Sequence, residues 1–246
     1  QVALKVMHQQ RAAATDPAAF LREARAAAQI NHPNLVTVHD AHADPERQLA
    51  CYAMEYVPGE TATALVQRQG PLPRGRALHI IYLTAKALEA AHRAGLAHRD
   101  VKPDNILVTA NGVVKLLDLG LVRALVDGGE QPPGPRRLAI VGTPEYSAPE
   151  QHRNPALAGP AADVFGLGCT LFFLLTGRPP FTGDTLLDLV VRMATEDPAW
   201  TPAVPSDCRA LLELMLAKSP DERLADGAQV VQVLEAMARG EAPQLP

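Results

Sequence analysis

The feature that most constrains this chain is a pair of dense polar motifs near its middle. Residues 98–105 read HRDVKPDN, and residues 118–120 read DLG. Between them, apolar runs at 106–109 and 113–117 flank an Asn-Gly pair at 111–112, the strongest short signal for a tight β-hairpin. The sequence therefore predicts a hairpin with one polar motif before its first strand and the other at the end of its second strand.

These motifs contain the residue types that phosphoryl transfer from a nucleotide requires. The reaction needs a carboxylate that orients the acceptor hydroxyl, oxygen ligands for Mg²⁺ and cations near the phosphates. Asp100 can supply the carboxylate, and Lys102 can neutralise charge on the transferred group. Asn105 and Asp118 can supply the metal ligands. Any one of these residues alone would usually be a solvated loop residue, but the whole set in this order is seldom accidental.

Length and charge limit the classes of protein to which the chain can belong. At 246 residues it can form one large domain or two lobes around a cleft. Its formal charge of -4 provides no basic field for nucleic acid, so we expect no nucleic-acid partner. The longest apolar run, 164–175, is shorter than the roughly 20 residues of a transmembrane helix, so we expect no membrane span within the chain.

The cysteines indicate a reducing compartment. Cys51, Cys169 and Cys208 are far apart and form no CxxC pair. We therefore expect small, buried thiols rather than disulfides or metal ligands.

The N-terminal part has the pattern of a small sheet with one helix. Residues 2–7 (VALKVM) alternate in a way that places Ala3 and Lys5 on one face of a strand and its larger apolar residues on the other. The further elements expected here are a helix over 20–30, capped at Asp16-Pro17, and strands over 35–39 and 49–57.

A Pro-Gly pair at 58–59 marks the boundary to a larger helical part. A helix is expected over 73–94, closed by Gly95, and the pattern is helical again from Asp163 onward. The first of these later helices is apolar almost all round, so it should be buried in the middle of its lobe. We divide the chain into a partial N-terminal lobe at 1–57, a C-terminal lobe at 58–240 and a linker at 241–246.

Together these motifs resemble those of the protein kinases, over nearly the whole chain. The resemblance implies an α+β, bilobal protein-kinase-like fold with a small β-rich N-lobe, truncated here, and a larger helical C-lobe. It implies ATP and Mg²⁺ as cofactors, and the same catalytic and metal-binding residues that the chemistry of the motifs indicates: Asp100, Lys102, Asn105 and Asp118.

The resemblance also implies a nucleotide site. Residues 2–5 (VALK) look like the strand whose lysine, Lys5, holds the α- and β-phosphates, and Glu23 stands where the family places the glutamate that pairs with this lysine. Residues 54–57 (MEYV) resemble the hinge that receives the adenine, with Met54 as the gatekeeper. The residues that the resemblance places at the nucleotide are Ala3, Lys5, Glu23, Met54, Asp118 and, through their backbone groups, Glu55 and Val57.

Two features resemble those of kinases that act on Ser or Thr in proteins. Residues 142–150 (GTPEYSAPE) match the family's substrate-docking segment, in which Thr143 would hydrogen-bond the side chains of Asp100 and Lys102. The position of Lys102, two residues after Asp100, is similar to the Ser/Thr-specific pattern. A protein substrate with Ser or Thr is therefore implied.

Other residues resemble structural positions of the family. Glu150 looks like the residue that forms a buried ion pair with an arginine near the C-terminus, here Arg223. Asp163 is either the anchor of the catalytic-loop backbone or an ordinary helix cap. In the HRD motif, His98 is a structural residue, and Arg99 is either the receiver of an activating phosphate or a structural cation.

The chain departs from the family pattern in three places. Leu119 stands where Phe is usual, which leaves the metal ligand before it intact. Residues 120–142 contain no Ser, Thr or Tyr. We hypothesise that activation does not depend on phosphorylation within this stretch, and that the stretch is set either by acidic residues, with Asp127 or Glu130 as partial substitutes, or by association. The glycine-rich loop that the family has before the lysine strand is not present in the sequence, and we expect it to have been truncated.

The leading hypothesis is a bacterial-type Ser/Thr protein kinase in signal transduction, either cytoplasmic or the cytoplasmic domain of a longer membrane-anchored protein. One alternative is a pseudokinase or signalling scaffold that binds nucleotide or partners without transfer. The absent glycine loop favours it, and the retained catalytic set disfavours it: Lys5, Asp100, Asn105 and Asp118. The other is a small-molecule phosphotransferase, which the docking segment and Arg223 disfavour.

Overall fold

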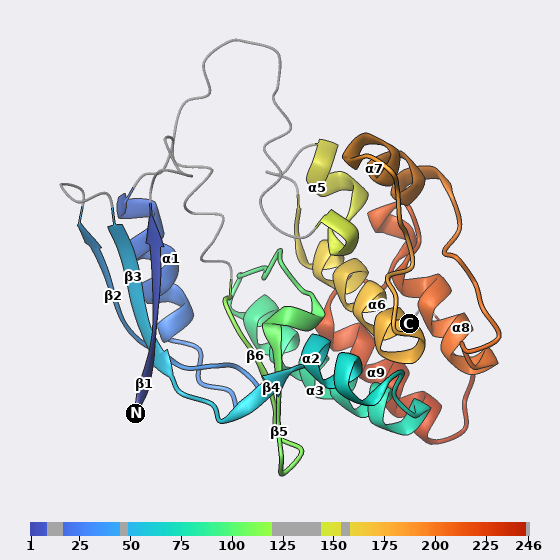
Figure 1. Cartoon of the computed structure of the whole chain (residues 1–246), viewed down its shortest axis with the longest axis horizontal. Helices are drawn as coiled ribbons and strands as arrows, with labels where there is room; N and C mark the ends of the chain where they lie inside the picture. Colours follow the sequence, from blue (N-terminus) through green and yellow to red (C-terminus); the bar gives the residue numbers. More distant parts are fainter. Residues whose placement is uncertain (9–16, 45–48, 120–143, 154–157, 245–246) are drawn as a thin grey trace.

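The computed structural model of the chain describes residues 1–8, 17–44, 49–119, 144–153 and 158–244. A small sheet with one helix lies at one end, and most of the helices lie at the other (Figure 1). A second small sheet lies between them.

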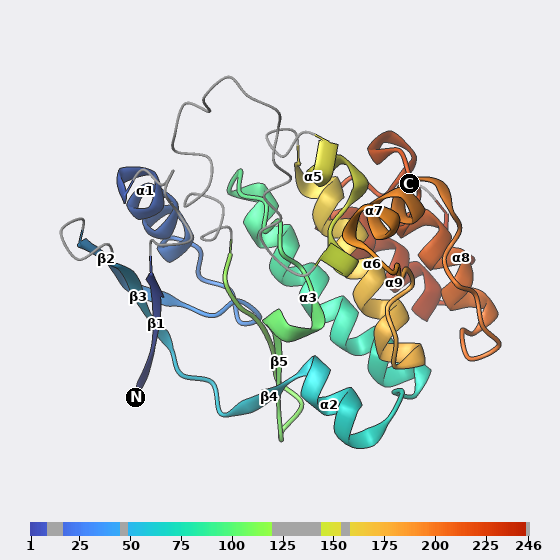
Figure 2. The same cartoon turned by 45° about the horizontal axis from the view of Figure 1, so that its top comes forward.

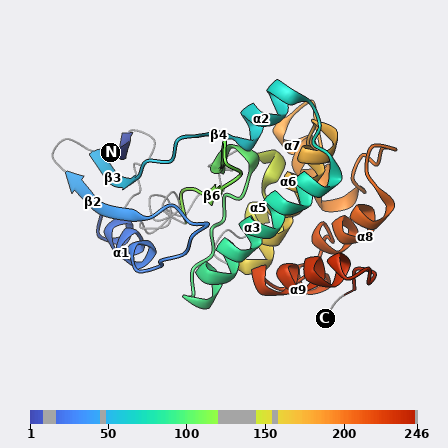
Figure 3. The same cartoon turned by 90° about the horizontal axis from the view of Figure 1, so that it is seen from below.

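The first sheet contains β1 (Val2–His8), β3 (Leu49–Glu55) and β2 (Val38–Asp44), in that order and all antiparallel. In its register Lys5 lies opposite Tyr52, so the two side chains are on one face. The other face carries the exposed Val2 and Leu4, as the alternation of residues 2–7 predicts. Helix α1 (Pro17–Ala28) covers the Lys5 face. Figure 3 shows α1 against β2 and β3.

Strand β2 starts three residues later than the sequence predicts, at Val38 rather than Leu35. Leu35 forms an isolated parallel bridge with Leu116, and Val36 donates its N–H to the carbonyl of Leu116 at 3.0 Å. The start of the predicted strand therefore connects the first sheet to the second instead of belonging to the first. The apolar residues at the start of the predicted strand suit either position, so the sequence pattern alone did not show which sheet they would join.

The second sheet contains β4 (Gly59–Thr61), β5 (Ile106–Thr109) and β6 (Val114–Leu116), in that order. The hairpin between β5 and β6 turns where the Asn-Gly pair predicts it. Gly112 has a φ of 80°, which favours glycine, and its N–H donates to the carbonyl of Thr109 at 3.0 Å.

The larger part is helical, and its centre is α6 (Pro160–Thr176). Every residue from Ala162 to Leu175 in this helix is buried, as its apolar sequence predicts. The long α3 (Arg74–Arg93) packs against α6 and runs beside α9 (Gly227–Ala238) (Figure 2). The remaining described helices are α2 (Ala62–Gln69), α5 (Pro149–Arg153), α7 (Leu186–Thr195) and α8 (Ser206–Met215), with short 3-10 turns at Pro103–Asn105, Pro144–Tyr146 and Pro220–Glu222.

The sequence analysis expects three buried thiols, and the structure buries two of them. Cys169 and Cys208 are buried, Cys51 is half-buried, and all three thiols are free. Within the described ranges, no helix is both long enough and apolar enough to cross a membrane.

Candidate active site

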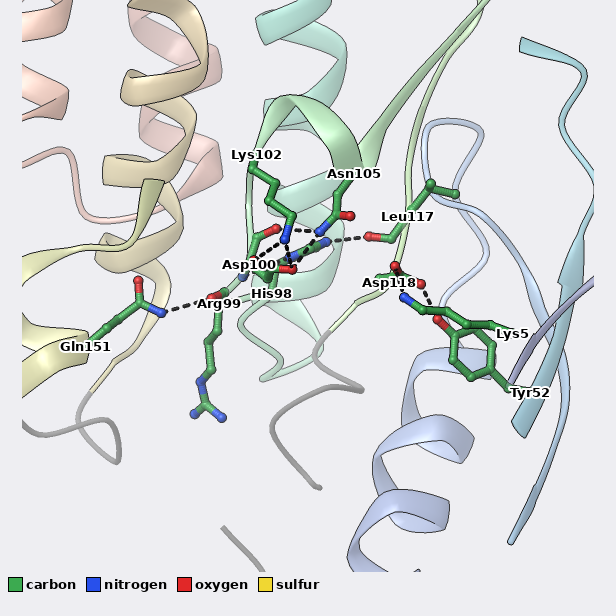
Figure 4. A network of polar contacts seen from close by, with 10 residues as sticks. All are labelled: Lys5, Tyr52, His98, Arg99, Asp100, Lys102, Asn105, Leu117, Asp118 and Gln151. Atoms are coloured by element: carbon green, nitrogen blue, oxygen red, sulfur yellow. Dashed lines mark hydrogen bonds and ion pairs between the residues drawn. The ribbon is translucent and has the colours of Figure 1, made fainter. Parts of the chain in front are cut away.

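Asp100 is at the centre of a polar cluster in the loop between α3 and β5 (Figure 4). Its Oδ1 accepts a hydrogen bond from Lys102 Nζ at 3.0 Å, and its Oδ2 accepts one from Asn105 Nδ2 at 2.9 Å. Asn105 also donates to the Asp100 carbonyl at 2.8 Å. The Asp100 side chain is 23% exposed. The cluster therefore holds a carboxylate in a defined orientation while leaving it accessible to a second molecule.

Asp163 holds the backbone of this loop from the buried helix α6. Its oxygens accept the N–H groups of His98 at 2.7 Å and of Arg99 at 2.5 Å. Helix α6 begins at Pro160 after Gly159, so Asp163 lies inside the helix and does not cap it. Of the two roles that the sequence left open for Asp163, the geometry fits the anchor of the loop.

Arg99 has a φ of 64°, a region that residues other than glycine seldom adopt. Side-chain contacts hold the backbone on both sides of this residue. Asp163 accepts its N–H, and Gln151 Nε2 donates to its carbonyl at 2.9 Å. Gln151 is itself oriented by the N–H of Ala148, which donates to its Oε1 at 2.8 Å. The backbone at Arg99 is therefore constrained from both α5 and α6.

Histidines extend the anchor on both sides. His92 Nε2 lies 2.8 Å from Asp163 Oδ2, and the N–H of Gly227 donates to His92 Nδ1 at 3.1 Å. This network assigns the proton to Nε2, which donates to Asp163. His98 is buried in the same way: it accepts the N–H of Asp100 at Nδ1, and its Nε2 lies 2.5 Å from the carbonyl of Leu117.

Asp118 is the centre of a second cluster, which faces the first across the end of β6 (Figure 4). It has a φ of 60°, and its side chain is 8% exposed. Lys5 Nζ donates to its Oδ2 and forms an ion pair with it, and the Tyr52 hydroxyl donates to its Oδ1. Burial and the neighbouring Asp118 charge raise the pKa of Tyr52 well above its usual value, so the phenol keeps its proton.

Leu117 joins the two clusters through its backbone. Its N–H donates to the carbonyl of Asn105 at 2.8 Å, and its carbonyl lies in hydrogen-bond contact with His98. The residue before Asp118 is thus connected to the loop that carries Asp100.

An apolar pocket lies between α1 and the first sheet, beside Asp118. Leu119 and Ala27 both line this pocket, and both are buried. Leu119 is therefore packed into the core although Ala27 offers only a small side chain. The lining residues are Ala27, Ile30, Leu35, Val36, Val38, Tyr52, Met54, Leu116, Asp118 and Leu119.

Met54 and Glu55 end β3 at the border of the two sheets. The Glu55 N–H donates to the carbonyl of Thr37 at 2.9 Å, and its Oε2 accepts from Lys115 Nζ at 2.8 Å. The side chain of Glu55 therefore links the first sheet to β6, a connection that the sequence did not reveal. Ala3 pairs with Met54 in the ladder, and Val57 follows as a half-buried residue.

Glu150 and Arg223 form the ion pair that the resemblance implies. The guanidinium of Arg223 donates to both carboxylate oxygens, at 2.6 and 2.9 Å, and its side chain is fully buried. It also donates to the carbonyls of Ala217, Lys218 and Ala161.

The structure thus brings most of the candidate residues into two linked clusters. Four residues named in the sequence analysis are not covered: Thr143, Asp127 and Glu130 lie outside the described residues, and the side chain of Glu23 on α1 is likewise not described. Sequence reasoning missed Tyr52, His92, Gln151 and Lys115. Among them only Tyr52 had a usable signal, since it lies opposite Lys5 once the strand register is known.

The candidate metal ligands form a sparse site. Where the structure describes side chains, no group of three or more His, Cys, Asp or Glu residues could hold a metal ion. Mg²⁺ suits such a site, because it keeps several waters and takes one or two protein oxygens together with substrate phosphates. Asn105 and Asp118 fit this demand. The Asn105 amide nitrogen is committed to Asp100, so its oxygen is the atom that could bind a metal ion.

Comparisons with known proteins give a consistent result. The profile of the protein kinase domain family matches residues 1–236. Serine/threonine-protein kinase PknB of Mycobacterium tuberculosis is 37% identical over 254 residues, covering 100% of this chain and 40% of that protein. Serine/threonine-protein kinase drp72 of Corynebacterium efficiens is 37% identical over 231 residues, covering 92% and 44%. Serine/threonine-protein kinase PknA of Mycobacterium tuberculosis is 36% identical, covering 92% and 52%.

The fold also matches a solved structure. Rad53 residues 1–466, in complex with AMP-PNP, superposes with a TM-score of 0.74 and 24% identity. The match covers 94% of this chain and 56% of that one. The chain spans about half or less of the length of the relatives described above.

Proposed function

Since this chain belongs to the protein kinase domain family and has the family's bilobal α+β fold, we propose that it transfers the γ-phosphoryl group of Mg-ATP to Ser or Thr hydroxyls of proteins. The proposal includes the division into an N-lobe at 1–57, a C-lobe at 58–240 and a linker at 241–246. We place the reaction in the cytoplasm, because the three free thiols suit a reducing compartment. The protein acts there either alone or as the cytoplasmic domain of a membrane-anchored protein.

The observation that carries the proposal is the orientation of Asp100. Lys102 Nζ contacts both of its oxygens, Asn105 Nδ2 donates to Oδ2, and the carboxylate remains partly exposed. In the reaction, the oxygen of a Ser or Thr hydroxyl bonds to the γ-phosphorus while the bond to the β,γ-bridging oxygen breaks. The hydroxyl proton passes to Asp100, and ADP is the leaving group. Lys102 supplies positive charge beside the transferred phosphoryl group.

The nucleotide site lies between the two lobes. Lys5 is proposed to bind the α- and β-phosphates, with Glu23 holding it, and the backbone of Glu55 and Val57 to bind the adenine beside Ala3 and Met54. Asn105 and Asp118 would hold Mg²⁺, which neutralises charge on the phosphates when bound. Thr143 is proposed to dock the protein substrate against Asp100 and Lys102.

One observation favours the second candidate, a nucleotide-binding scaffold without transfer. Both carboxylate oxygens of Asp118 already contact protein groups, Lys5 and Tyr52. A protein in which Lys5 never leaves Asp118 would have neither a phosphate-binding lysine nor a fully available metal ligand. Measuring transfer and nucleotide binding on the same protein separates the two candidates.

The test is transfer of radiolabelled phosphate from ATP to a generic protein substrate by the full-length gene product. We expect Asp100→Asn to lower the rate by about 10²–10⁴-fold, because the proton acceptor is lost. The matched control is Asp104→Asn, which removes an exposed carboxylate four residues away and should leave the rate within about twofold. Chelation of Mg²⁺ should stop transfer. The protein substrate phosphorylated by the wild type should contain phosphoserine or phosphothreonine.

Two results would reject the kinase assignment. Transfer that Asp100→Asn leaves unchanged would exclude Asp100 from the reaction. A wild-type protein that binds ATP without transferring phosphate to itself or to any protein offered would instead support the scaffold.

A further inference from the structure

Tyr52 occupies an unusual place for a tyrosine, because its ring is in the core and its hydroxyl is at the candidate metal ligand. The residue is 1% exposed and is among the largest fully buried side chains of the described chain. Its hydroxyl donates to Oδ1 of Asp118, across 66 positions of sequence. It enters from β3, next to Lys5 from β1, so two adjacent strands deliver one donor to each oxygen of the same carboxylate (Figure 4).

The hydroxyl is the part of Tyr52 that packing alone does not require. The ring lines the apolar pocket together with Met54 and Leu116, and the ring of a phenylalanine would line it equally well. A buried hydroxyl adds a desolvation cost unless it is hydrogen-bonded, and here its acceptor is Asp118. The presence of tyrosine at this position is therefore best explained by its bond to the carboxylate.

Asp118 needs such support. Its φ of 60° lies in a region that non-glycine residues populate only where the surroundings hold them. Without a fixed partner, its carboxylate could rotate about its own side-chain torsions. The ion pair with Lys5 is a poor permanent support, because Lys5 is also the proposed ligand of the nucleotide phosphates. Tyr52 has no such second role in the proposed function.

We propose that Tyr52 is a positioning residue for Asp118: its hydroxyl fixes the plane of the carboxylate so that the remaining lone pairs are directed at a divalent cation. A carboxylate has about four lone-pair sites, so a bond from Tyr52 leaves room for a metal ion on the same group. Hydrogen bonds to metal-binding carboxylates commonly orient them, and losing such a partner typically weakens metal binding by about 10–100-fold. The inference rests on the proposed function, since it assigns Asp118 to the metal.

The test is metal binding by Tyr52→Phe in the full-length gene product, measured without catalysis. Free Mn²⁺ is followed by electron paramagnetic resonance while Mn²⁺ is titrated into protein saturated with ADP. We expect the dissociation constant of Mn²⁺ to rise by about 10-fold or more. Binding of ADP without metal should stay within about twofold of wild type, a split that a merely structural defect would not produce.

Tyr82→Phe is the matched control. Tyr82 on α3 also donates its hydroxyl to a carboxylate, Glu235 on α9, at 2.9 Å, but far from the candidate site. Its loss should leave Mn²⁺ affinity unchanged. Circular dichroism and the melting temperature check that each variant folds.

A second measurement covers the case in which Tyr52→Phe does not fold. The protein is labelled with 3-fluorotyrosine, and the ¹⁹F resonances of all other tyrosines of the gene product, Tyr56, Tyr82 and Tyr146 among them, are assigned through their own phenylalanine variants, leaving that of Tyr52. Mg²⁺ added to the ADP complex should shift the Tyr52 resonance and not that of Tyr82. A Tyr52 resonance that is insensitive to Mg²⁺ would reject the inference.

The outcomes distinguish this inference from the proposed function. If Asp118→Asn abolishes Mn²⁺ binding while Tyr52→Phe binds Mn²⁺ as well as or better than wild type, the role of Tyr52 is wrong and the metal assignment stands. If Asp118→Asn also binds Mn²⁺ normally, the metal assignment itself fails, and the role of Tyr52 fails with it.

Discussion

At the scale of single residues, buried charges connect segments that are far apart in the sequence. Arg223, whose side chain is fully buried, joins the turn before α9 to Glu150 on α5. Asp163 on α6 joins the catalytic-loop backbone to His92 on α3. A buried charge is costly to desolvate unless its partners compensate, so these contacts make the arrangement specific rather than simply adding stability.

The Arg223 pair leads to a prediction about stability. Arg223→Met keeps most of the volume but leaves the half-buried Glu150 carboxylate and three backbone carbonyls without their donor. We expect the free energy of unfolding to fall by about 3–5 kcal/mol, as for other buried ion pairs that lose one partner. Denaturation by urea, followed by circular dichroism, measures it.

Arg239→Met is the control for this prediction. Arg239 pairs with Glu241 on the surface, where both side chains are more than half exposed. Its replacement should leave the urea midpoint unchanged, because exposed ion pairs contribute little. If both replacements lower the free energy of unfolding equally, burial is not the reason why the Arg223 pair stabilises the protein.

The residues with recognisable motifs were predictable, whereas their partners were not. The HRD and DLG motifs indicated Asp100, Asn105 and Asp118 without any structure. Tyr52 and His92 could not be found in this way, because their partners lie 66 and 71 positions away and the contacts depend on strand register and helix packing. Lys5 was predicted to face the site, but its contact with Asp118 emerged only from the structure.

At the scale of elements, one glycine determines how closely α6 approaches the catalytic loop. A Cβ atom at Gly166 would lie 2.7 Å from the carbonyl oxygen of Val101 and 3.1 Å from that of Tyr146. Both neighbours are backbone atoms, which cannot move as a flexible side chain can. The helix therefore rests directly against the segment that holds Asp100.

We predict that Gly166→Ala destabilises the protein although alanine favours helices. The forced separation of α6 from the loop should cost about 1–3 kcal/mol, more than the helix propensity gained. Gly75→Ala is the matched control, since Gly75 is also helical, in α3, and a Cβ there meets nothing within 4 Å. That replacement should stabilise by up to about 1 kcal/mol.

Thermal and urea unfolding of the two alanine variants give the comparison directly. We expect the free energy of unfolding to fall in Gly166→Ala and to rise in Gly75→Ala. If Gly166→Ala proves as stabilising as Gly75→Ala, the close contact between α6 and the loop does not exist in solution.

Elements with strong local signals were predicted well, and those that depend on distant partners were not. The hairpin at Asn111-Gly112 and the buried α6 followed from turn chemistry and from an apolar sequence without a polar face. The predicted start of β2 was wrong, because residues 35–37 form backbone contacts with Leu116 and Glu55 instead of extending the strand. Nothing local in these apolar residues specifies which sheet they join.

At the scale of the whole molecule, the described polar contacts between the first sheet and the rest gather at β6 and at Asp118, just after this strand, which Lys5 and Tyr52 contact. Leu116 exchanges backbone hydrogen bonds with Asn34 and Val36, and Lys115 Nζ bonds to Glu55 at 2.8 Å and to the carbonyl of Leu35 at 3.3 Å. All of these contacts meet at β6, between the sheet and the helices (Figure 1). A single strand thus carries much of the described polar connection between the two lobes.

This arrangement predicts that the first sheet opens more readily than the helical lobe when the connection is weakened. Lys115→Met keeps the apolar stem of this half-buried lysine but removes the donor to Glu55 and to Leu35. A charged hydrogen bond that is partly screened by solvent should contribute about 1 kcal/mol, which corresponds to about fivefold in an opening equilibrium. Amide hydrogen exchange, which reports such local opening, should accelerate by about that factor in β3 and stay unchanged in α6.

The comparison with a second variant makes the test specific to the connection between the lobes. Arg68→Met removes the ion pair between Arg68 on α2 and Glu60 on β4, which lies within the larger part. It should change exchange in neither β3 nor α6. If Lys115→Met accelerates exchange equally in β3 and α6, the chain opens as one unit, and the contact with Glu55 stabilises the whole molecule rather than the relation of its lobes. Unequal acceleration would show that the lobes can move independently across β6, the strand just before Asp118, so the geometry of the candidate active site depends on how firmly the lobes are joined.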